Sequence, residues 1–356
     1  MIYDYIIIGA GSAGCVLANR LSANPSNSIL LIEAGGPDKK MEIHIPGGYA
    51  KLHKSEVDWG GYWTEPQECA LNRKIYLPRG KVLGGSSSTN AMVYVRGDKE
   101  DYNDWSSFGN KGWSYNEVLP YFKKSEHHED INNAYHSQNG ELNVSFAKHF
   151  KTPFGAAFVN ACKQVGFDLN SDYNGETIKG AGFFQFNIKD GKRNSAAVAF
   201  LKPCLTRRNL KVLTHTRVKK ILLKNDKAIG VEIMTGKNST QEIFAHKEVI
   251  LSAGSFASPQ LLMLSGIGDK DELGRFGIES VLHLPGVGKN LQDHLFYAVS
   301  ALSTVKKGQN HHIKPLNQAL DIANYFLFKK GVLTTGPLEA VAFGCTSLSP
   351  KRVDYQ

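Results

Sequence analysis

The sequence predicts an α/β protein, α+β overall, whose doubly wound sheet is assembled from separate segments of the chain. In the first segment the apolar run Ile6–Ile8 leads into three closely spaced glycines and a helical stretch that ends near Leu21. In the second the apolar strand Val249–Leu251 leads into a turn of small residues and another helix. Loop-like insertions separate the two strand–turn–helix patterns, so the sheet draws its strands from non-contiguous parts of the chain.

The first pattern has the spacing of a Rossmann-like dinucleotide site. Gly9, Gly11 and Gly14 form a G-x-G-x-x-G motif in which they allow, in order, a tight turn, approach of a pyrophosphate and close helix packing. The next strand ends at Glu33, 33 − 14 = 19 positions after Gly14 and near the roughly 20 at which an acid binds a ribose hydroxyl. An acid there, in place of arginine, argues against a 2′-phosphate. Flavin and nicotinamide dinucleotides both remain open.

Composition excludes several classes of protein. No run of about 18 apolar residues and no secretion signal are present, so a cytoplasmic location is expected. The five cysteines are scattered without C-x-x-C spacing, which indicates reduced thiols and no structural metal. The net charge of +9 comes from dispersed lysines and arginines without a nucleic-acid motif, so no nucleic-acid partner is expected. Peripheral association with the inner face of an anionic membrane stays open.

Local signals predict elements in the middle of the chain. Ser114 and Glu117 have the spacing of a capping box, and Pro120 is expected to bend or end the helix that follows. The segment TPFGAAFVNACKQVG, residues 152–166, is predicted to be helical. The segment 209–234 is predicted to form strands broken by the turn signal KNDK.

Four segments together resemble the glucose-methanol-choline (GMC) flavin oxidoreductases, and within them the choline dehydrogenase and bacterial alcohol dehydrogenase type. These are GAGSAG with its downstream acid, Pro78–Gly97 (PRGKVLGGSSSTNAMVYVRG), Gly254–Gly268 (GSFASPQLLMLSGIG) and Gly286–Leu295 (GVGKNLQDHL). They occur in family order through most of the chain. The resemblance implies FAD as the cofactor.

The resemblance also implies a domain organisation, in which a discontinuous FAD-binding domain adjoins a substrate domain built on an antiparallel sheet. The first part of the FAD-binding domain, with lid-like loops, is expected at 1–150, and its second part at 206–295. The substrate domain is expected to begin at 151–205, together with a helix, and to continue, incomplete, at 296–356.

Site residues follow from the resemblance. Val82 with Asn90–Val93 is expected near the isoalloxazine, and Val218 is expected to meet the adenine through its backbone, although both valines have a core role as an alternative. Thr89 stands where some relatives attach flavin through a histidine, which implies noncovalent FAD. The full expected cofactor set is Gly9, Gly11, Gly14, Glu33, Val82, Gly85, Asn90, Ala91, Met92, Val93 and Val218.

The implied reaction is oxidation of a primary alcohol, choline-like or aliphatic, by hydride transfer to flavin N5 while a base removes the hydroxyl proton. The electron acceptor is not identified by the sequence. Glu339 stands where choline-oxidising relatives place a carboxylate towards the substrate cation, and a hydrogen-bonded structural acid is its alternative role. A non-catalytic dinucleotide-binding remnant and an NAD-dependent Rossmann dehydrogenase are the competing interpretations.

No catalytic residue is assigned in this chain. The family's base is a histidine near its C-terminal end, and no segment here matches it, so the chain is expected to be a C-terminally truncated member without measurable turnover. His127–His128 and His311–His312 are expected on the surface, and His294 is expected to be structural.

Overall fold

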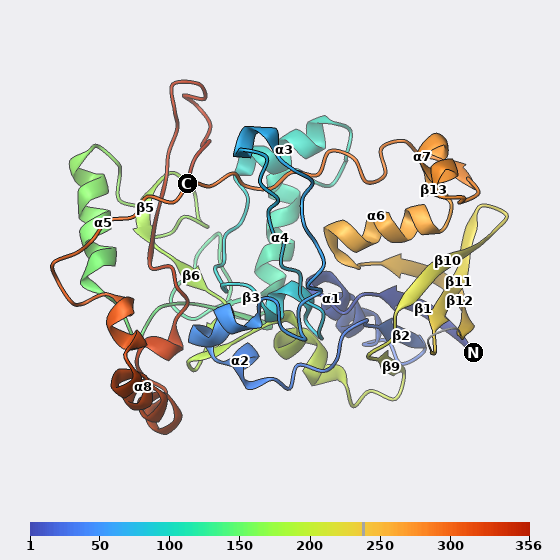
Figure 1. Ribbon diagram of the computed structural model, residues 1–356, viewed down its shortest axis with the longest axis horizontal. Coiled ribbons are helices and arrows are strands. Elements are labelled where there is room, and N and C mark those ends of the chain that lie inside the picture. The colour runs from blue at the N-terminus through green and yellow to red at the C-terminus, as the bar shows by residue number, and fades with distance from the viewer. Residues whose placement is uncertain (237–238) are drawn as a thin grey trace. The chain divides into compact units, whose positions relative to one another are not determined.

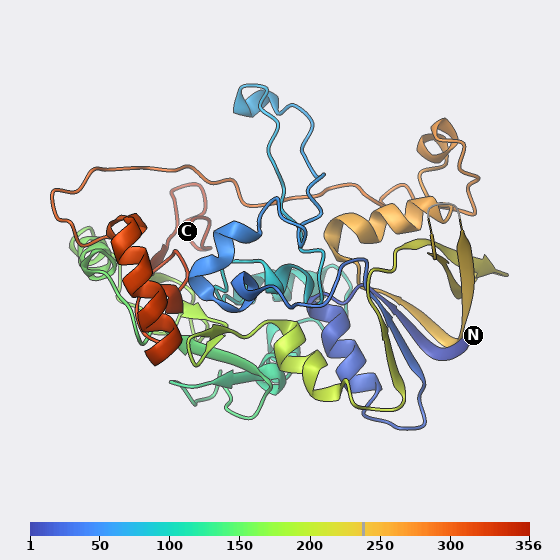
Figure 2. The ribbon, with the colours of Figure 1, turned by 60° about the horizontal axis from the view of Figure 1, so that its bottom comes forward.

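The computed structural model describes residues 1–236 and 239–356 and divides into two compact units, traced in Figure 1 and Figure 2. The first unit comprises Met1–Lys39, Leu52–Thr89 and Ser195–Ala301. The second comprises Lys40–Lys51, Asn90–Asn194 and Leu302–Gln356. These divisions fall at other positions than the boundaries expected from the sequence, and those functional boundaries stay a prediction.

The first unit is built on a six-stranded sheet with the order β10-β11-β12-β1-β2-β9. Its strands are β1 (Ile2–Ile8), β2 (Ile29–Ile32), β9 (Leu210–Leu213), β10 (Val218–Lys224), β11 (Lys227–Met234) and β12 (Thr240–Leu251). β12, β1, β2 and β9 run parallel, and β10 and β11 extend the sheet as antiparallel hairpins. β1 and β12 are neighbours although they come from distant parts of the sequence (Figure 2). This confirms an α/β sheet assembled from separate segments.

Apolar sequence places β1 and β2 in the centre of this sheet. The side chains of Ile6–Ile8 and of all four residues of β2 are buried, as expected for parallel strands covered on both faces. Helix α1 (Ser12–Leu21) packs against β1 and β2, and helix α6 (Gly254–Leu264) packs against β10. The unit also contains α7 (Lys270–Arg275), β13 (Ile267–Gly268) and β14 (Leu282–His283).

The second unit combines short strands with one short helix, α2, and four longer helices. Its strands are β3 (Glu126–His128), β4 (Leu142–Phe146), β5 (Gly180–Phe183), β6 (Gln185–Phe186), β7 (Ile188–Lys189), β8 (Lys192–Arg193) and β15 (Ala340–Phe343). Its helices are α2 (Met41–His44), α3 (Lys99–Ser107), α4 (Tyr115–Ser125), α5 (Pro153–Gln164) and α8 (Pro315–Phe328). β5 pairs antiparallel with β15, and β4 pairs antiparallel with β6. An aromatic core around Phe184 and Phe186 packs between them.

Local signals are mostly confirmed, with one exception. The carboxylate of Glu117 accepts a hydrogen bond from the backbone N–H of Ser114 at 3.1 Å, so the capping box is present. Helix α4 nevertheless continues through Pro120 to Ser125, so of the two effects expected of Pro120 an end of the helix does not occur, and a bend stays a prediction. The missing N–H of proline costs one backbone bond, and here the capping box and the buried face of the helix outweigh that loss. Helix α5 and the turn at Asn225–Asp226 are as predicted.

Within residues 1–236 and 239–356, none of the helices combines the length and the apolar character needed to cross a lipid bilayer.

Leu30 tests the central role of β2, because its side chain is completely buried. We expect Leu30→Ala to lower the free energy of unfolding by about 2–5 kcal/mol, through lost burial and the cavity that remains. Leu320→Ala is the matched control, since Leu320 is 61% exposed on α8 and should change stability by no more than about 0.5 kcal/mol. Urea unfolding curves measure both, and equal effects would contradict this view of the core.

Candidate functional site

A cavity of about 480 Å³ lies in the first unit, at the carboxyl ends of β1 and β2. Five residues of the expected cofactor set line it: Gly9, Gly11, Glu33, Gly85 and Val218. Ligands of α/β proteins bind at this edge of the sheet, where the strands end and the helices begin. The structure therefore brings the separate sequence motifs of the first unit to one place.

The glycines of the motif have different surroundings, and each suits the predicted role. Gly9 has φ +96°, and a Cβ there would lie 2.6 Å from the carbonyl oxygen of Ser252. A Cβ on Gly14 would lie only 1.9 Å from the carbonyl oxygen of Gly9, so its absence allows α1 to pack closely. A Cβ on Gly11 would meet no atom within 4 Å and would project into open space. The backbone at Gly11 is thus left accessible to a ligand.

Two helix N-termini line the same cavity. Helix α1 starts after Gly11 and α6 after Ala253, and neither N-cap residue provides a side-chain hydrogen bond. The first-turn N–H groups of both helices therefore lack a side-chain acceptor, and both helix dipoles place positive potential at their N-termini. Such ends bind phosphate groups, so two of them at one cavity favour a ligand with a diphosphate.

Glu33 provides the carboxylate of the cavity. Glu33 is 6% exposed. Its Oε2 accepts a hydrogen bond from the N–H of Ala10 at 2.9 Å, and its Oε1 accepts one from the N–H of Gly35 at 2.8 Å. Burial raises the pKa of Glu33, against the lowering effect of these hydrogen bonds and of Lys81. Each carboxylate oxygen has a second acceptor position, which leaves capacity for the hydroxyl groups of a ribose.

Aromatic and cationic side chains that sequence reasoning missed form part of the cavity wall. Tyr62 and Phe256 meet edge to face with ring centroids 5.2 Å apart, and the guanidinium of Arg79 lies 4.2 Å from the ring centroid of Phe256. Trp59 and Arg217 line the cavity beside them. The only signal in the sequence is the aromatic density of the loop segment DWGGYW, because these side chains are brought together by tertiary packing.

A neighbouring recess of about 410 Å³ adds positive charge. It shares Trp59 and Arg217 with the cavity, and Lys81 and His215 also line it. The ammonium group of Lys81 lies 5.0 Å from the ring centroid of Trp59. Within the described ranges no carboxylate side chain lines this recess, so its potential favours an anionic ligand nearby.

Two predicted residues of the first unit lie behind the cavity. Gly14 is buried against the Gly9 loop, and Val82 is fully buried and forms an isolated bridge with Gly36. Neither lines the cavity in the part of the chain that the structure describes. Val82 has the surroundings of a core residue, and a contact with flavin stays a prediction for it.

The predicted flavin-facing residues Asn90–Val93 belong to the second unit. Met92 is buried in the left-handed region with φ +63°, and the carbonyl oxygen of the Asn90 side chain accepts a hydrogen bond from the N–H of Met92 at 3.0 Å. The same oxygen accepts one from the buried guanidinium of Arg193 at 2.8 Å. This holds a strained turn in one conformation. Its contact with flavin stays a prediction.

Glu339, the candidate substrate carboxylate, has structural partners in the second unit. Its Oε2 accepts hydrogen bonds from both the backbone N–H and the hydroxyl of Thr152, each at 2.9 Å, and its Oε1 accepts one from Gln309 at 3.3 Å. Thr152 is the N-cap of α5, so Glu339 also stabilises the start of that helix. These contacts correspond to the structural alternative, and a substrate contact for Glu339 stays a prediction.

None of the described histidines is placed to act as a general base at this cavity. Across the described parts of the chain, no histidine lines it, and His294 is exposed. The expectation that His128 lies on the surface is wrong, because its side chain is completely buried in the second unit. Its polar neighbours in sequence gave no sign of this burial, which depends on packing against His136 and Phe146.

Comparison with known sequences identifies relatives. The sequence profile of the family described as GMC oxidoreductase matches residues 3–296. The chain is 48% identical to mitochondrial choline dehydrogenase of Homo sapiens over 82% of its own length and 50% of that protein. It is 43% identical to an alcohol dehydrogenase [acceptor] of Pseudomonas putida over 99% of its length and 64% of that protein. It thus spans between half and two thirds of these relatives.

Solved structures show the same fold. The chain matches pyridoxine 4-oxidase from Mesorbium loti with a TM-score of 0.79 and 36% identity, over 82% of this chain and 57% of that one. It matches an FAD-dependent oxidoreductase from Chaetomium thermophilum with a TM-score of 0.87 and 32% identity, over 96% of this chain and 62% of that one. The chain therefore belongs to the GMC oxidoreductase family of FAD-binding flavoproteins.

Proposed function

We propose that the cavity of the first unit holds FAD noncovalently and that the protein oxidises a primary alcohol, choline-like or aliphatic. The observation that carries the cofactor assignment is the cavity itself, with two uncapped helix N-termini, an accessible glycine backbone and a buried carboxylate. The substrate class rests on relatives named as choline and alcohol dehydrogenases. The electron acceptor is left unassigned.

The residues present fit the ADP half of FAD. The N-termini of α1 and α6 and the backbone at Gly11 would hold the diphosphate, because they supply N–H groups and positive potential without a blocking side chain. Glu33 would accept the ribose hydroxyl groups, and the backbone at Val218 would meet the adenine. Arg79 and Arg217 would add favourable charge for the phosphates.

FAD supplies the hydride acceptor for the carbinol carbon of the alcohol. The chain's own residues then have to bind the alcohol, exclude water and accept the hydroxyl proton. A general base contributes typically about 10²–10⁴ in rate, and no residue of this chain is assigned to that role. Reduction of the flavin by substrate is therefore expected to be slow, and turnover with an added electron acceptor is expected to stay unmeasurable.

Anaerobic addition of alcohol tests the reaction directly. FAD-loaded protein incubated with choline or a simple primary alcohol should lose its visible flavin absorbance over a long incubation. The control is 2-methyl-2-propanol, whose carbinol carbon has no hydrogen to transfer. Unchanged absorbance with every primary alcohol, in protein that holds FAD, would reject the oxidation and leave the alternative of a dinucleotide-binding protein without catalysis.

Substitutions at two glycines test the cofactor site. We expect Gly11→Ala to weaken FAD binding by about 1–3 kcal/mol, because the methyl group occupies the space of the ligand, while stability changes by no more than about 0.5 kcal/mol. Gly9→Ala is the contrast, since its positive φ and the contact with Ser252 should reduce stability itself. FAD titration and thermal melts separate the two effects. Titration with NAD is the competitor experiment, and preferential NAD binding would overturn the flavin assignment.

The threonine at position 89 predicts that acid releases the flavin, because the cofactor is not covalently attached there. Its hydroxyl cannot form the histidyl linkage implied for some relatives, so acid precipitation should move all the flavin into the supernatant. The measurement is the visible absorbance of the supernatant and of the washed pellet. Yellow colour retained in the pellet would show that another side chain attaches the cofactor.

A further inference from the structure

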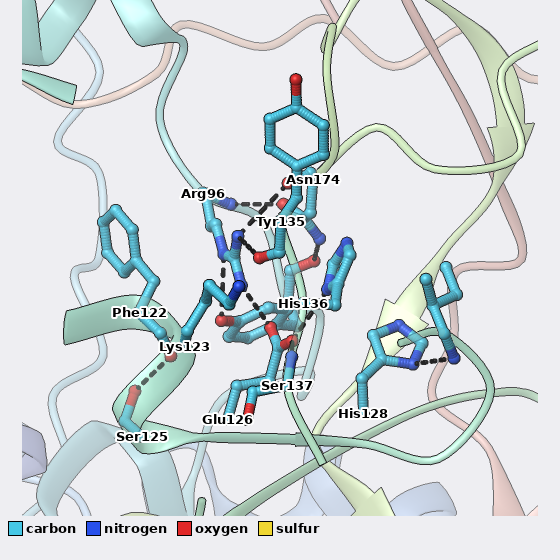
Figure 3. A network of polar contacts seen from close by, with 12 residues as sticks. Arg96, Phe122, Lys123, Ser125, Glu126, His128, Tyr135, His136, Ser137 and Asn174 are labelled. Atoms are coloured by element: carbon cyan, nitrogen blue, oxygen red, sulfur yellow. Dashed lines mark hydrogen bonds and ion pairs between the residues drawn. The ribbon is translucent and has the colours of Figure 1, made fainter. Parts of the chain in front are cut away.

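A row of four charged side chains is embedded in the second unit, remote in sequence from the glycine motif, and Figure 3 labels Arg96, Glu126 and His136 of this row. Arg96 is 5% exposed, Glu126 is completely buried and His136 is 1% exposed, and Asp172 ends the row. The four residues come from four separate segments of the chain. Arg96 lies in the family segment Pro78–Gly97, and the other three residues lie outside the sequence motifs.

The contacts in this row fix the protonation of its histidine. Arg96 Nη2 donates to Glu126 Oε2 at 2.5 Å, and the other oxygen of Glu126 lies 2.8 Å from His136 Nδ1. On the opposite side of the ring, His136 Nε2 lies 3.0 Å from both carboxylate oxygens of Asp172. A neutral imidazole has one N–H and would direct a lone pair at one of these carboxylates. Only the histidinium donates on both sides.

The charge balance leads to the same conclusion. Arg96 and a protonated His136 neutralise Glu126 and Asp172, whereas a neutral His136 leaves one negative charge in excess in a buried place. Burial lowers the pKa of His136, but its hydrogen bonds to Asp172 and Glu126 outweigh that effect and raise it above 6.5. The same contacts outweigh burial at Glu126 and Asp172 and hold the pKa of each carboxyl below its ordinary value.

The side chains packed around the row do not supply the positive charge that a neutral His136 would lack. His128 packs edge to face on His136 with ring centroids 4.8 Å apart, and its Nδ1 accepts the backbone N–H groups of Asp130 and Ile131. Burial and the charge on His136 lower the pKa of His128, so it stays neutral. Gln185 donates to Asp172 Oδ1 at 3.1 Å, and the Tyr94 hydroxyl lies 3.3 Å from Arg96 Nε. Among the described residues of this cluster, His136 is the histidine whose contacts raise its pKa, so it is the group that loses its charge as pH rises above the ordinary range of a histidine.

The row is connected to the backbone that follows Asn90–Val93. The carbonyl of Tyr94 accepts hydrogen bonds from the hydroxyl of Tyr173 and the amide of Asn174, both at 3.0 Å. The backbone N–H of Arg96 donates to Asn174 Oδ1 at 2.7 Å. Tyr173 and Asn174 directly follow Asp172 in sequence, so the contact between His136 and Asp172 fixes the loop that holds the strand-like segment 94–96.

We infer that His136 is a positioning residue, which as a histidinium holds the Asp172–Asn174 loop against residues 94–96 and which releases this segment when it loses its proton. Resting on the proposed function, the same release would loosen the adjoining Asn90–Val93 turn, whose contact with flavin is a prediction from the family resemblance. The device is a switch that opens on the alkaline side.

The direction with pH follows from the three groups. The folded pKa of His136 lies above its ordinary 6.5, so its stabilising contribution is complete below that value and is lost as pH rises through the folded pKa. Glu126 and Asp172 have lowered pKa values, so their contribution is present above 4.5 and 3.8, respectively, and is lost as pH falls through the folded values. The cluster is most stabilising between pH 4.5 and 6.5.

Melting temperatures and hydrogen exchange from about pH 6 to about pH 9 test this inference on the full chain. Wild type should lose melting temperature across this range, and exchange in residues 90–96 should increase beyond the intrinsic effect of pH. His136→Gln should melt lower and exchange faster in this segment at about pH 6, and the difference from wild type should shrink as pH rises, so that the variant has a flatter pH profile. His246→Gln is the control, because His246 is exposed on β12, and it should follow wild type. Parallel pH profiles for wild type and His136→Gln would overturn the inference.

Imidazole ¹⁵N spectra of the wild type keep the inference testable if His136→Gln does not fold. One histidine should show both ring nitrogens protonated near neutral pH and lose a proton only in alkali. If no histidine is doubly protonated at neutral pH, the inference is wrong. Hydrogen exchange needs no cofactor, so absent FAD binding with the exchange result intact would reject the proposed function alone.

Discussion

The carbonyl group of Gly9 is the point on which the site of the first unit depends. Its oxygen accepts a hydrogen bond from the hydroxyl of Ser252 at 2.9 Å. The same oxygen would lie only 1.9 Å from a Cβ on Gly14. Ser252 directly follows β12, so this one carbonyl connects both strand–turn–helix patterns. Because Gly14 has no side chain, α1 can pack against this carbonyl, and the N-termini of α1 and α6 both reach the cavity.

The second unit depends on another kind of interaction. Arg96 and His136 neutralise two carboxylates inside a low-dielectric interior, where breaking one buried pair typically costs about 3–5 kcal/mol. Such pairs are weak evidence for stability compared with an apolar core, but they specify one arrangement of the four segments that carry them. The arrangement fixes residues 94–96, which lie immediately after the turn predicted to face the flavin.

The sequence predicted those features that are encoded locally. The capping box at Ser114 and the family with its FAD cofactor are confirmed. Gly9, Gly11 and Glu33 line the cavity, and their contact with the cofactor stays a prediction. Side chains joined by tertiary packing were missed, including Tyr62 and Arg79 at the cavity. The surface position expected for His128 is wrong, and Pro120 does not end α4, since in both cases packing across the unit outweighs the local signal.

The two units therefore handle charge in opposite ways, and this bears on which substitutions each tolerates. The cavity attracts an anion with backbone N–H groups, which no side-chain change can remove but any added side chain at Gly11 can block. The buried row balances its charges with side chains, so each of its members is replaceable only together with its partner. Steric additions should thus damage the first unit and charge deletions the second. The effect of a substitution in either unit therefore depends more on its chemistry than on its distance from the cavity.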